Sequence, residues 1–275
     1  MSHDGLIRKG FGLKKEVAGE LAGDYASELV RQARESGHEL HWPDLSIRLA
    51  EEFGFCYGVE RAVDYAYETR MQFPDRRLFI TGEIIHNPRV NRRLRELGFE
   101  FLDGAYDSKI SPADLDEKDV VLLPAFGVPT DMLEELKAVG CVLVDTTCGS
   151  VLAVWKNVER YAKQGFTCLI HGKWRHEETR ATASRALLYP EGRYLVVLDM
   201  EEAEYVARYV EKSGDRDEFL AKFEGACSEG FDPDQDLGRI GMANQTTMLS
   251  SESLAIAGRV GRAMLERWGR EEAKE

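Results

Sequence analysis

Short apolar runs alternate with amphipathic segments along most of the chain after Leu45. The first pairs are "RLFIT" with "NPRVNRRLRELG", "VVLLPAF" with "PTDMLEELKAVG", and "CVLVDTT" with "SVLAVWKNVERYAKQG". Later runs are "FTCLIHG", "RYLVVLD" before "MEEAEYVARYV", and "RIGMANQTT" before "SESLAIAGRVGRAMLERWG". Strands that alternate with helices in this way predict layered α/β sub-domains with mainly parallel sheets.

The stretch before this alternation, residues 1–44, is charged and only partly periodic. It predicts an N-terminal extension with a helix near residues 20–36 and a break at "HWPD". For the rest of the chain we expect a first α/β lobe over residues 45–140, a second lobe over 141–249, and a final helix over 250–275.

Chemically capable residues follow several of these apolar runs. In open α/β sheets, ligands bind beyond the carboxyl ends of the strands, where loops and helix N-termini meet. We therefore expect a ligand site where these residues gather. They are Cys56 after "SIRLAEEFGF", His86 after "LFITGEII", Cys148 after "VLVDTT", His171 and His176 after "FTCLI", and Gln245, Thr246 and Thr247 after "IGMAN".

Two cysteines lie at predicted strand-to-helix junctions. The motif "GFCYGVERAV" places Cys56 between glycines and before a helical apolar pattern, where the helix dipole favours a thiolate. Cys148 lies 92 residues further on (148 − 56) at a similar junction. This spacing excludes a zinc finger or a ferredoxin-like loop, but it permits a cluster held between sub-domains. The alternative is that one or both cysteines are buried small apolar residues.

The chain has five cysteines in all, an odd number spread far apart, which does not fit a disulfide framework. Cys141 in "CVLVDTT" and Cys168 in "FTCLIHG" lie inside strand-like runs, and we expect both to pack in the core. Cys227 in "FEGACSEGF" lies near a predicted helix end, which favours a structural role.

The motif "EIIHNPRV" sets His86 at the start of a helix, with Asn87 as its cap and Pro88 in its first turn. Backbone N–H groups and an imidazole at a helix start favour binding of a phosphate group. The alternative is a histidine in a capping region that has no ligand.

Two further motifs carry polar groups suited to catalysis. "HGKWRHEETRATAS" places His176 next to Glu177 and Glu178, where a carboxylate could carry protons; the alternative is a solvated charged loop. "ANQTTML" supplies consecutive polar residues, among them Thr246 and Thr247, whose hydroxyls could orient a ligand oxygen; the alternative is a simple helix cap.

Charge and hydropathy narrow the class of protein. The 275 residues include 36 Lys and Arg against 49 Asp and Glu, and the resulting net charge of -13 is spread along the chain. This balance argues against nucleic acid as the main partner. The N-terminus lacks the apolar core of a signal peptide, and no stretch reaches the roughly 18 continuous apolar residues of a membrane span. We therefore expect a soluble, cytoplasmic protein without a membrane partner.

Together and in this order, "GFCYGVERAV", "GEIIHNPRVNRRLRELG", "VDTTC", "HGKWRHEET" and "NQTTML" resemble the 4-hydroxy-3-methylbut-2-enyl diphosphate reductases, the LytB-type iron–sulfur family. The match runs from about Arg8 to the end, and "RKGFG", "IRLAE" and "AFG" look most like the cyanobacterial and plant branch. The resemblance implies reductive removal of a hydroxyl group from an allylic diphosphate. The products would be isopentenyl and dimethylallyl diphosphates of the non-mevalonate isoprenoid pathway, and reduced ferredoxin or flavodoxin would donate the electrons.

The resemblance also implies the cofactor. In that family three sub-domains with pseudo-threefold symmetry each give one cysteine to a [4Fe–4S] cluster, whose fourth iron binds the substrate hydroxyl. Cys56 and Cys148 match two of these ligands. The third follows "NQTTML" and the next helix in a third sub-domain, whereas no cysteine follows Cys227 in this chain, which ends at Glu275. We therefore expect a fragment with two of the three lobes, itself inactive or nearly so.

Five residues match substrate-handling positions of the family. His86 and His176 match histidines that bind the diphosphate. Glu178 matches the carboxylate that delivers a proton, and Thr246 with Thr247 matches a threonine pair around the substrate hydroxyl. These assignments agree with the helix-start and proton-carrying roles that the motifs favour.

One position departs from the family pattern. Many members carry a histidine where this chain has Phe126 in "LLPAFGVP". We therefore expect other residues of the protein to supply part of the diphosphate binding. A rival hypothesis is a non-catalytic two-lobe remnant that binds a diphosphate or a protein partner. Other rivals are a quinolinate synthase-like dehydratase and a thiol-nucleophile hydrolase. "HEET" and "NQTT" favour the reductase, and no general base is marked for Cys56.

Overall fold

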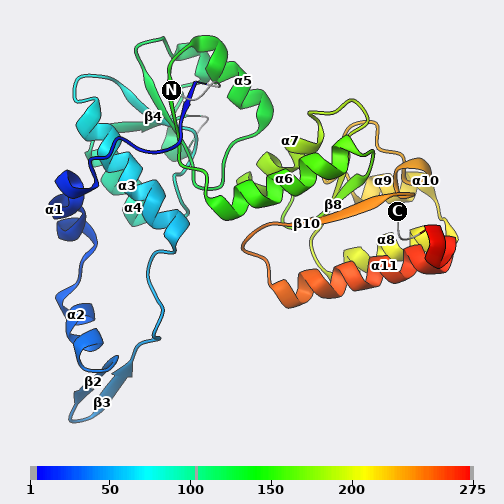
Figure 1. Cartoon of the computed structure of the whole chain (residues 1–275), viewed down its shortest axis with the longest axis horizontal. Helices are drawn as coiled ribbons and strands as arrows, with labels where there is room; N and C mark the ends of the chain where they lie inside the picture. Colours follow the sequence, from blue (N-terminus) through cyan, green and yellow to red (C-terminus); the bar gives the residue numbers. More distant parts are fainter. Residues whose placement is uncertain (1–4, 103–104, 273–275) are drawn as a thin grey trace. The chain divides into compact units, whose positions relative to one another are not determined.

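The computed structural model describes residues 5–102 and 105–272 and has the α/β architecture predicted from the sequence (Figure 1). In both larger sheets every strand pair is parallel. None of the helices in the described part combines the length and apolar character needed to cross a bilayer. The chain forms two compact units, which are residues 1–125 with 136–148 and residues 126–135 with 149–275.

The first unit is built on a five-stranded sheet with the order β1-β7-β6-β4-β5. Its inner strands are apolar except for Asp145 at the end of β7, and Leu78, Ile80 and Val120 are fully buried. Such continuous apolar runs are typical of parallel strands that are covered on both faces. The strands are β1 (Leu6–Ile7), β4 (Leu78–Ile80), β5 (Phe99–Phe101), β6 (Val120–Leu123) and β7 (Val142–Asp145).

Helices α1 and α3 pack against each other in this unit and supply Val17, Ala62 and Ala66 to its core. The division between the two units falls within α5. The helices and short 3-10 turns are α1 (Lys14–Tyr25), α3 (Tyr57–Gln72), α4 (Pro88–Glu96), η1 (Ala105–Asp107), η2 (Pro112–Asp114) and α5 (Thr130–Val139).

The N-terminal segment differs from the single helix predicted near residues 20–36. It forms α1 and then α2 (Glu28–Glu35), because the backbone is extended at Ala26 and Ser27. Ser27 is the N-cap residue of α2, and serine is one of the residues preferred there.

Strands β2 (Glu39–Trp42) and β3 (Leu45–Arg48) form an antiparallel hairpin, and the motif "HWPD" supplies the end of β2 and the two turn residues, Pro43 and Asp44. The run "SIRLAEEFGF" therefore belongs partly to this hairpin and not to the five-stranded sheet. The expectation that Cys56 follows a strand of the main sheet is wrong in this respect, although Cys56 does precede a helix.

The second unit is built on a three-stranded sheet with the order β10-β8-β9. Helix α11 packs against α8, and its residues Ile256, Val260 and Ala263 are buried at helical spacing. The elements are α6 (Gly149–Lys163), β8 (Thr167–His171), α7 (Glu177–Ala186), β9 (Arg193–Val197), α8 (Met200–Lys212), α9 (Arg216–Lys222), α10 (Pro233–Asp236), β10 (Ile240–Asn244) and α11 (Ser250–Glu272).

The two units do not coincide with the lobes expected from the sequence. Strand β7, which the expected lobe boundary at residue 141 assigns to the second lobe, pairs with β1 and β6 in the first sheet. Strand β1, from the expected extension, joins the same sheet. Helix α11, expected as a separate final segment, belongs to the second unit. The alternation of strands and helices gives the order of the elements, but it does not say which sheet each strand joins.

Candidate functional site

Cys56 is the N-cap residue of α3 in the first unit. Its backbone is extended, its carbonyl accepts a hydrogen bond from the Glu60 N–H at 2.9 Å, and its side chain is exposed. Two residues earlier, Gly54 has a φ of +103°, a conformation that favours glycine and turns the chain into the helix start. The motif therefore presents a thiol at the positive end of a helix, as predicted from the sequence.

Cys148 meets the same helix end. A Cβ atom at Gly58, in the first turn of α3, would lie 2.7 Å from the Cβ of Cys148 and 3.1 Å from its Sγ. Only a residue without a side chain permits this approach. The structure thus brings the two cysteines predicted as metal ligands to one helix terminus of one unit. Both remain accessible, since Cys56 is exposed and Cys148 is half-buried.

The loop that carries Cys148 is fixed by backbone and side-chain hydrogen bonds. The Cys148 N–H donates to the carbonyl of Ala125 at 2.8 Å. The guanidinium of Arg61 in α3 donates to the carbonyl of Thr147 at 2.9 Å. The hydroxyl of Thr146 donates to the carbonyl of Leu123 at 2.6 Å. These hydrogen bonds attach the Cys148 loop to α3 and to the end of β6, so the loop backbone fixes the position of the thiol.

A buried carboxylate extends this network to the N-terminal segment. Asp145 accepts from the Thr147 N–H at 2.9 Å and from the Arg8 Nε at 2.9 Å. Arg61 also donates to the carbonyl of Arg8 at 3.0 Å. Sequence reasoning did not single out Arg8, Arg61 or Asp145, although each lies in or beside a quoted motif, "RKGFG", "GFCYGVERAV" or "VDTTC". Their partners are distant in the sequence, so the motifs alone did not reveal them.

The other three cysteines are placed for packing. Cys141 and Cys168 are buried, which confirms the prediction that both belong to the core. Burial raises the pKa of the Cys141 thiol to about 11 and that of Cys168 to about 12. Cys227 is half-buried against the core of the second unit, and burial raises the pKa of its thiol as well. Metal ligation requires the thiolate, so these environments do not favour it.

His86 follows β4 in the first unit, at the start of α4. The Asn87 side chain accepts hydrogen bonds from the N–H groups of Arg89 and Val90, at 3.0 and 3.2 Å, which confirms the predicted cap. The exposed imidazole of His86 has its Nδ1 2.9 Å from an oxygen of Glu83. This carboxylate orients the ring, and the histidine lies beside a helix start, where an anion is favoured.

Glu178 and Thr246 form a close pair in the second unit. Glu178, only 3% exposed, accepts a hydrogen bond from the Thr246 N–H at 2.5 Å and another from the Thr246 hydroxyl at 3.0 Å. Thr246 lies two residues after the end of β10, and Glu178 lies in the first turn of α7. Both carboxylate oxygens are therefore fixed by one residue, and the threonine hydroxyl is in place to pass a proton to or from the carboxyl group.

His176 is the N-cap residue of α7, where the sequence left a solvated loop as an alternative. Its Nδ1 accepts a hydrogen bond from the Glu178 N–H at 3.1 Å. A ring nitrogen that accepts carries no proton, so the imidazole has its hydrogen on Nε2, the nitrogen that can donate to a ligand. The Phe126 ring lies edge-on to His176, with centroids 6.1 Å apart, and is mostly buried.

Gln245 organises the loop after β10. Its side-chain oxygen accepts from the Lys173 N–H and from the Thr179 hydroxyl, both at 3.1 Å, and its amide donates to the Thr247 hydroxyl at 2.7 Å. Gln245 and Thr179 are buried, whereas Thr247 is exposed. The sequence analysis counts Gln245 among the polar residues of this loop but predicts no specific role for it. Its geometry is that of a positioning residue, since it fixes one of the two predicted threonines.

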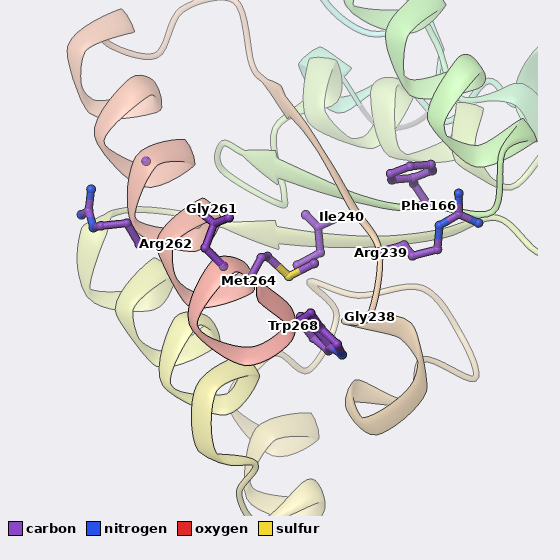
Figure 2. Close-up of a pocket in the computed structure, with 10 residues that line it drawn as sticks. Phe166, Gly238, Arg239, Ile240, Gly261, Arg262, Met264 and Trp268 are labelled. Carbon is purple, nitrogen blue, oxygen red and sulfur yellow. The ribbon is translucent and has the colours of Figure 1, made fainter. Parts of the chain in front are cut away.

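One cavity of the second unit lies away from these groups. It has a volume of about 620 Å³ and lies between α11 and the start of β10 (Figure 2). Its wall is mainly apolar, with Met264 and Trp268 of α11 near Ile240 of β10. No predicted site residue lines this cavity, and its only charged lining residues are Arg239 and Arg262. It therefore lacks the acid, hydroxyl and thiol groups that the candidate chemistry requires.

Comparison with known proteins agrees with the motifs. The family model described as LytB protein matches residues 47–271. The chain is 50% identical over 262 residues to the 4-hydroxy-3-methylbut-2-enyl diphosphate reductase of Gloeothece citriformis, covering 95% of this chain and 64% of that protein. It is also 50% identical over 278 residues to the reductase of the same name from Thermosynechococcus vestitus, covering all of this chain and 67% of the relative. The chain thus spans about two thirds of the length of these relatives.

Two solved structures of reductases have a fold similar to that of this chain. One is (E)-4-hydroxy-3-methyl-but-2-enyl diphosphate reductase, described as the terminal enzyme of the non-mevalonate pathway. It matches with a TM-score of 0.56 and 26% identity over 78% of this chain and 62% of that chain. The Plasmodium falciparum E-1-hydroxy-2-methyl-but-2-enyl-4-diphosphate reductase matches with a TM-score of 0.56 and 21% identity, over 77% of this chain and 55% of that one.

Proposed function

The chain belongs to the LytB protein family, and from this premise we propose that it carries two thirds of a 4-hydroxy-3-methylbut-2-enyl diphosphate reductase. The reaction removes the substrate hydroxyl as water, with two electrons and two protons, and gives isopentenyl and dimethylallyl diphosphates. The observation that carries the proposal is the approach of Cys148 to Gly58 at the helix end that Cys56 caps. Two accessible thiols at one helix N-terminus are suited to metal binding.

We assign Cys56 and Cys148 as two ligands of a [4Fe–4S] cluster. The fit rests on the close approach of Cys148 to Gly58, the accessibility of both thiols, and the burial of Cys141 and Cys168. When bound, the cluster would supply electrons and a Lewis-acidic iron for the departing oxygen. Arg61 would hold the Cys148 loop in position through its hydrogen bond to the Thr147 carbonyl. A reduced ferredoxin or flavodoxin would be the electron source.

Glu178 and Thr246 are the proposed proton-delivery pair. In the ionised state the Thr246 hydroxyl donates to a Glu178 oxygen at 3.0 Å. In the protonated state this hydrogen bond reverses, so that Glu178 donates to Thr246 and the threonine hydroxyl donates onward to the leaving oxygen. The Thr246 N–H stays bound to the other carboxylate oxygen, which holds the group in place during the transfer. Thr247, fixed by Gln245, would orient the same oxygen.

His176 and His86 are the proposed diphosphate-binding residues. The His176 tautomer has its proton on Nε2, so a neutral imidazole donates one hydrogen bond at the start of α7. His86 stands beside the capped start of α4. Phe126 has no hydrogen-bond donor, and its edge contact supports the His176 ring instead.

A chimera tests the function. This chain would replace the matching two thirds of the Thermosynechococcus vestitus reductase, of which it covers 67%. We expect the chimera to support growth of a bacterium depleted of its own reductase, and to form isopentenyl diphosphate with a chemical reductant. Cys56→Ser and Glu178→Gln should abolish both, whereas Cys227→Ser should retain both. A folded chimera that binds iron but forms no product would contradict the proposal.

A further inference from the structure

His86 in the first unit is the last member of a relay of three side chains. The hydroxyl of Tyr106 donates a hydrogen bond to one oxygen of Glu83 at 2.6 Å. The other oxygen of Glu83 lies 2.9 Å from Nδ1 of His86. Glu83 and His86 lie in the loop between β4 and α4, whereas Tyr106 lies in η1, which follows β5. Two segments of the unit thus meet at one carboxylate.

The loop between β4 and α4 is itself fixed from inside the unit. Asn91 of α4 is fully buried, accepts a hydrogen bond from the Ile84 N–H at 3.3 Å and donates one to the Ile85 carbonyl at 2.8 Å. The Ile84 carbonyl accepts another from the Ala125 N–H at 3.1 Å. The backbone is therefore held by these bonds, and the relay acts on the orientation of the His86 side chain.

Tyr106 reaches Glu83 from an unfavourable backbone conformation. It has a φ of 55° and a ψ of 40°, and the next residue, Asp107, has a φ of 61°. Few residues with a bulky side chain adopt this left-handed region. The Tyr106 ring packs against Phe101 with centroids 4.8 Å apart, and the Arg95 guanidinium lies over it, 5.6 Å from its centroid. Backbone strain that is held by such contacts is concentrated at functional sites.

The hydroxyl of Tyr106 keeps its hydrogen. Burial raises the pKa of Tyr106 above its ordinary value, and the hydrogen bond to Glu83 raises it further. The tyrosine therefore stays a donor and occupies one oxygen of the Glu83 carboxylate. A carboxylate has no hydrogen to donate, so the bond on its other oxygen needs a hydrogen on Nδ1 of His86.

The two histidines of the candidate site therefore carry their hydrogens on opposite nitrogens. His176 accepts at Nδ1 and has its hydrogen on Nε2. A neutral His86, with its hydrogen on Nδ1, has a lone pair on Nε2, and a lone pair repels a phosphate oxygen. Only the imidazolium form of His86 has a hydrogen on both nitrogens.

We propose that Glu83 and Tyr106 are positioning residues for His86, and that His86 binds the diphosphate as an imidazolium ion with Glu83 as its counter-ion. This inference rests on the proposed reductase function. Tyr106 fixes the carboxylate, and the carboxylate orients the ring and stabilises its positive charge. The Nε2–H group of His86 then donates a charge-assisted hydrogen bond to a phosphate oxygen.

The charge of the ligand favours this assignment. A diphosphate carries several negative charges, and the chain as a whole has a net charge of -13. A neutral His176 donates a hydrogen bond but balances none of this charge, and Phe126 stands where many members of the family carry a further histidine. A cationic His86 supplies positive charge that the other two side chains lack.

The first test locates the hydrogens on the ring. In the 275-residue chain, with its histidines labelled at both ring nitrogens, NMR chemical shifts distinguish Nδ1–H from Nε2–H. His86→Asn identifies the His86 signals among those of the six histidines. In alkaline solution, where imidazoles are neutral, we expect the hydrogen on Nδ1 in wild type and on Nε2 in Glu83→Ala. Glu100→Ala, an exposed change on β5, should leave it on Nδ1.

The second test measures binding and does not require turnover. The protein is the chimera described above, the probe is inorganic pyrophosphate, and the method is calorimetry. Glu83→Gln keeps the shape of the side chain and should weaken binding about 10-fold or more, because the counter-ion is lost. Tyr106→Phe should weaken it about 3-fold. In the double variant Tyr106→Phe should add no further loss, because the tyrosine acts through Glu83.

The outcomes separate this inference from the proposed function. In the pyrophosphate complex of the wild-type chimera both ring nitrogens of His86 should carry hydrogen, and a single hydrogen there would overturn the proposal. If His86→Asn weakens binding but Glu83→Gln does not, the relay is wrong and the proposed function stands. If His86→Asn has no effect on pyrophosphate binding, the proposed diphosphate role of His86 is wrong and this inference fails with it.

Discussion

Gly58 and Cys148 are so close that a methyl group on Gly58 would overlap the cysteine side chain, with 2.7 Å between the two Cβ atoms. The first turn of α3 and the loop after β7 can meet only because this residue has no side chain. The contact gives Gly58, the second glycine in "GFCYGVERAV", a specific function. It admits a second thiol to the helix end that Cys56 occupies.

Gly58→Ala should disturb this contact and little else. The added methyl group forces the Cys148 loop to move, so we expect a loss of about 1–3 kcal/mol in the free energy of unfolding and reduced iron retention. Gly149→Ala is the matched control, because a Cβ there meets no atom within 4 Å. Urea unfolding and iron analysis of both variants check the prediction. Equal behaviour of the two would mean that the close approach is not a constraint.

Arg61→Leu should loosen the loop that carries Cys148. The change removes the hydrogen bonds that Arg61 donates to the carbonyls of Thr147 and Arg8. The expected cost is about 1–3 kcal/mol, and the rate at which Cys148 reacts with iodoacetamide should rise. Mass spectrometry of the labelled peptides measures this rate. Arg208→Leu, an exposed change in α8, serves as the control, and an unchanged Cys148 rate in Arg61→Leu would contradict the anchoring role.

Glu178→Gln should separate proton delivery from folding. The amide oxygen can still accept from the Thr246 N–H, and the amide NH2 can donate to the Thr246 hydroxyl, so the fold is kept, but the side chain has no acidic proton to deliver. In the chimera, we expect product formation to fall at least 100-fold while iron content stays constant. Glu201→Gln, in the exposed first turn of α8, is the control. Full activity of Glu178→Gln would exclude this carboxyl group as the proton donor.

The buried thiol of Cys168 should make stability fall in alkali. Burial raises its pKa from 9.0 to about 12, so the folded state holds the proton more tightly than the unfolded state. The stabilising contribution is complete below pH 9 and is lost as the pH rises toward about 12. Cys168→Ala should flatten this part of the curve of unfolding free energy against pH. The exposed Cys56→Ala should not, and identical slopes in wild type and Cys168→Ala would refute the assignment.

Much of this arrangement follows from local sequence patterns. The alternation of strands and helices predicts the α/β class, and "HNP" predicts the cap of α4. Cys141 and Cys168, each inside an apolar run, are buried as expected. These features depend on neighbouring residues, so a single sequence contains the information.

Other features depend on contacts between distant segments. The pairing of β1 with β7, and the approach of Gly58 to Cys148, join residues about 90 or more positions apart, and no local pattern encodes them. The hairpin of β2 and β3 was also missed, because its two strands have four residues each and Pro43 and Asp44 were interpreted as a helix break. His176 as the cap of α7 was missed because histidine is not among the residues preferred at that position.

The central claim is that Cys56 and Cys148 hold iron together. The most direct measurement is the iron and sulfide content of the anaerobically reconstituted chain, with electron paramagnetic resonance of its reduced form, in wild type and four cysteine variants. We predict that wild type, Cys141→Ser and Cys227→Ser bind iron and sulfide, and that Cys56→Ser and Cys148→Ser each lose both. Equal iron in all five proteins, or none in the wild type, would contradict the claim.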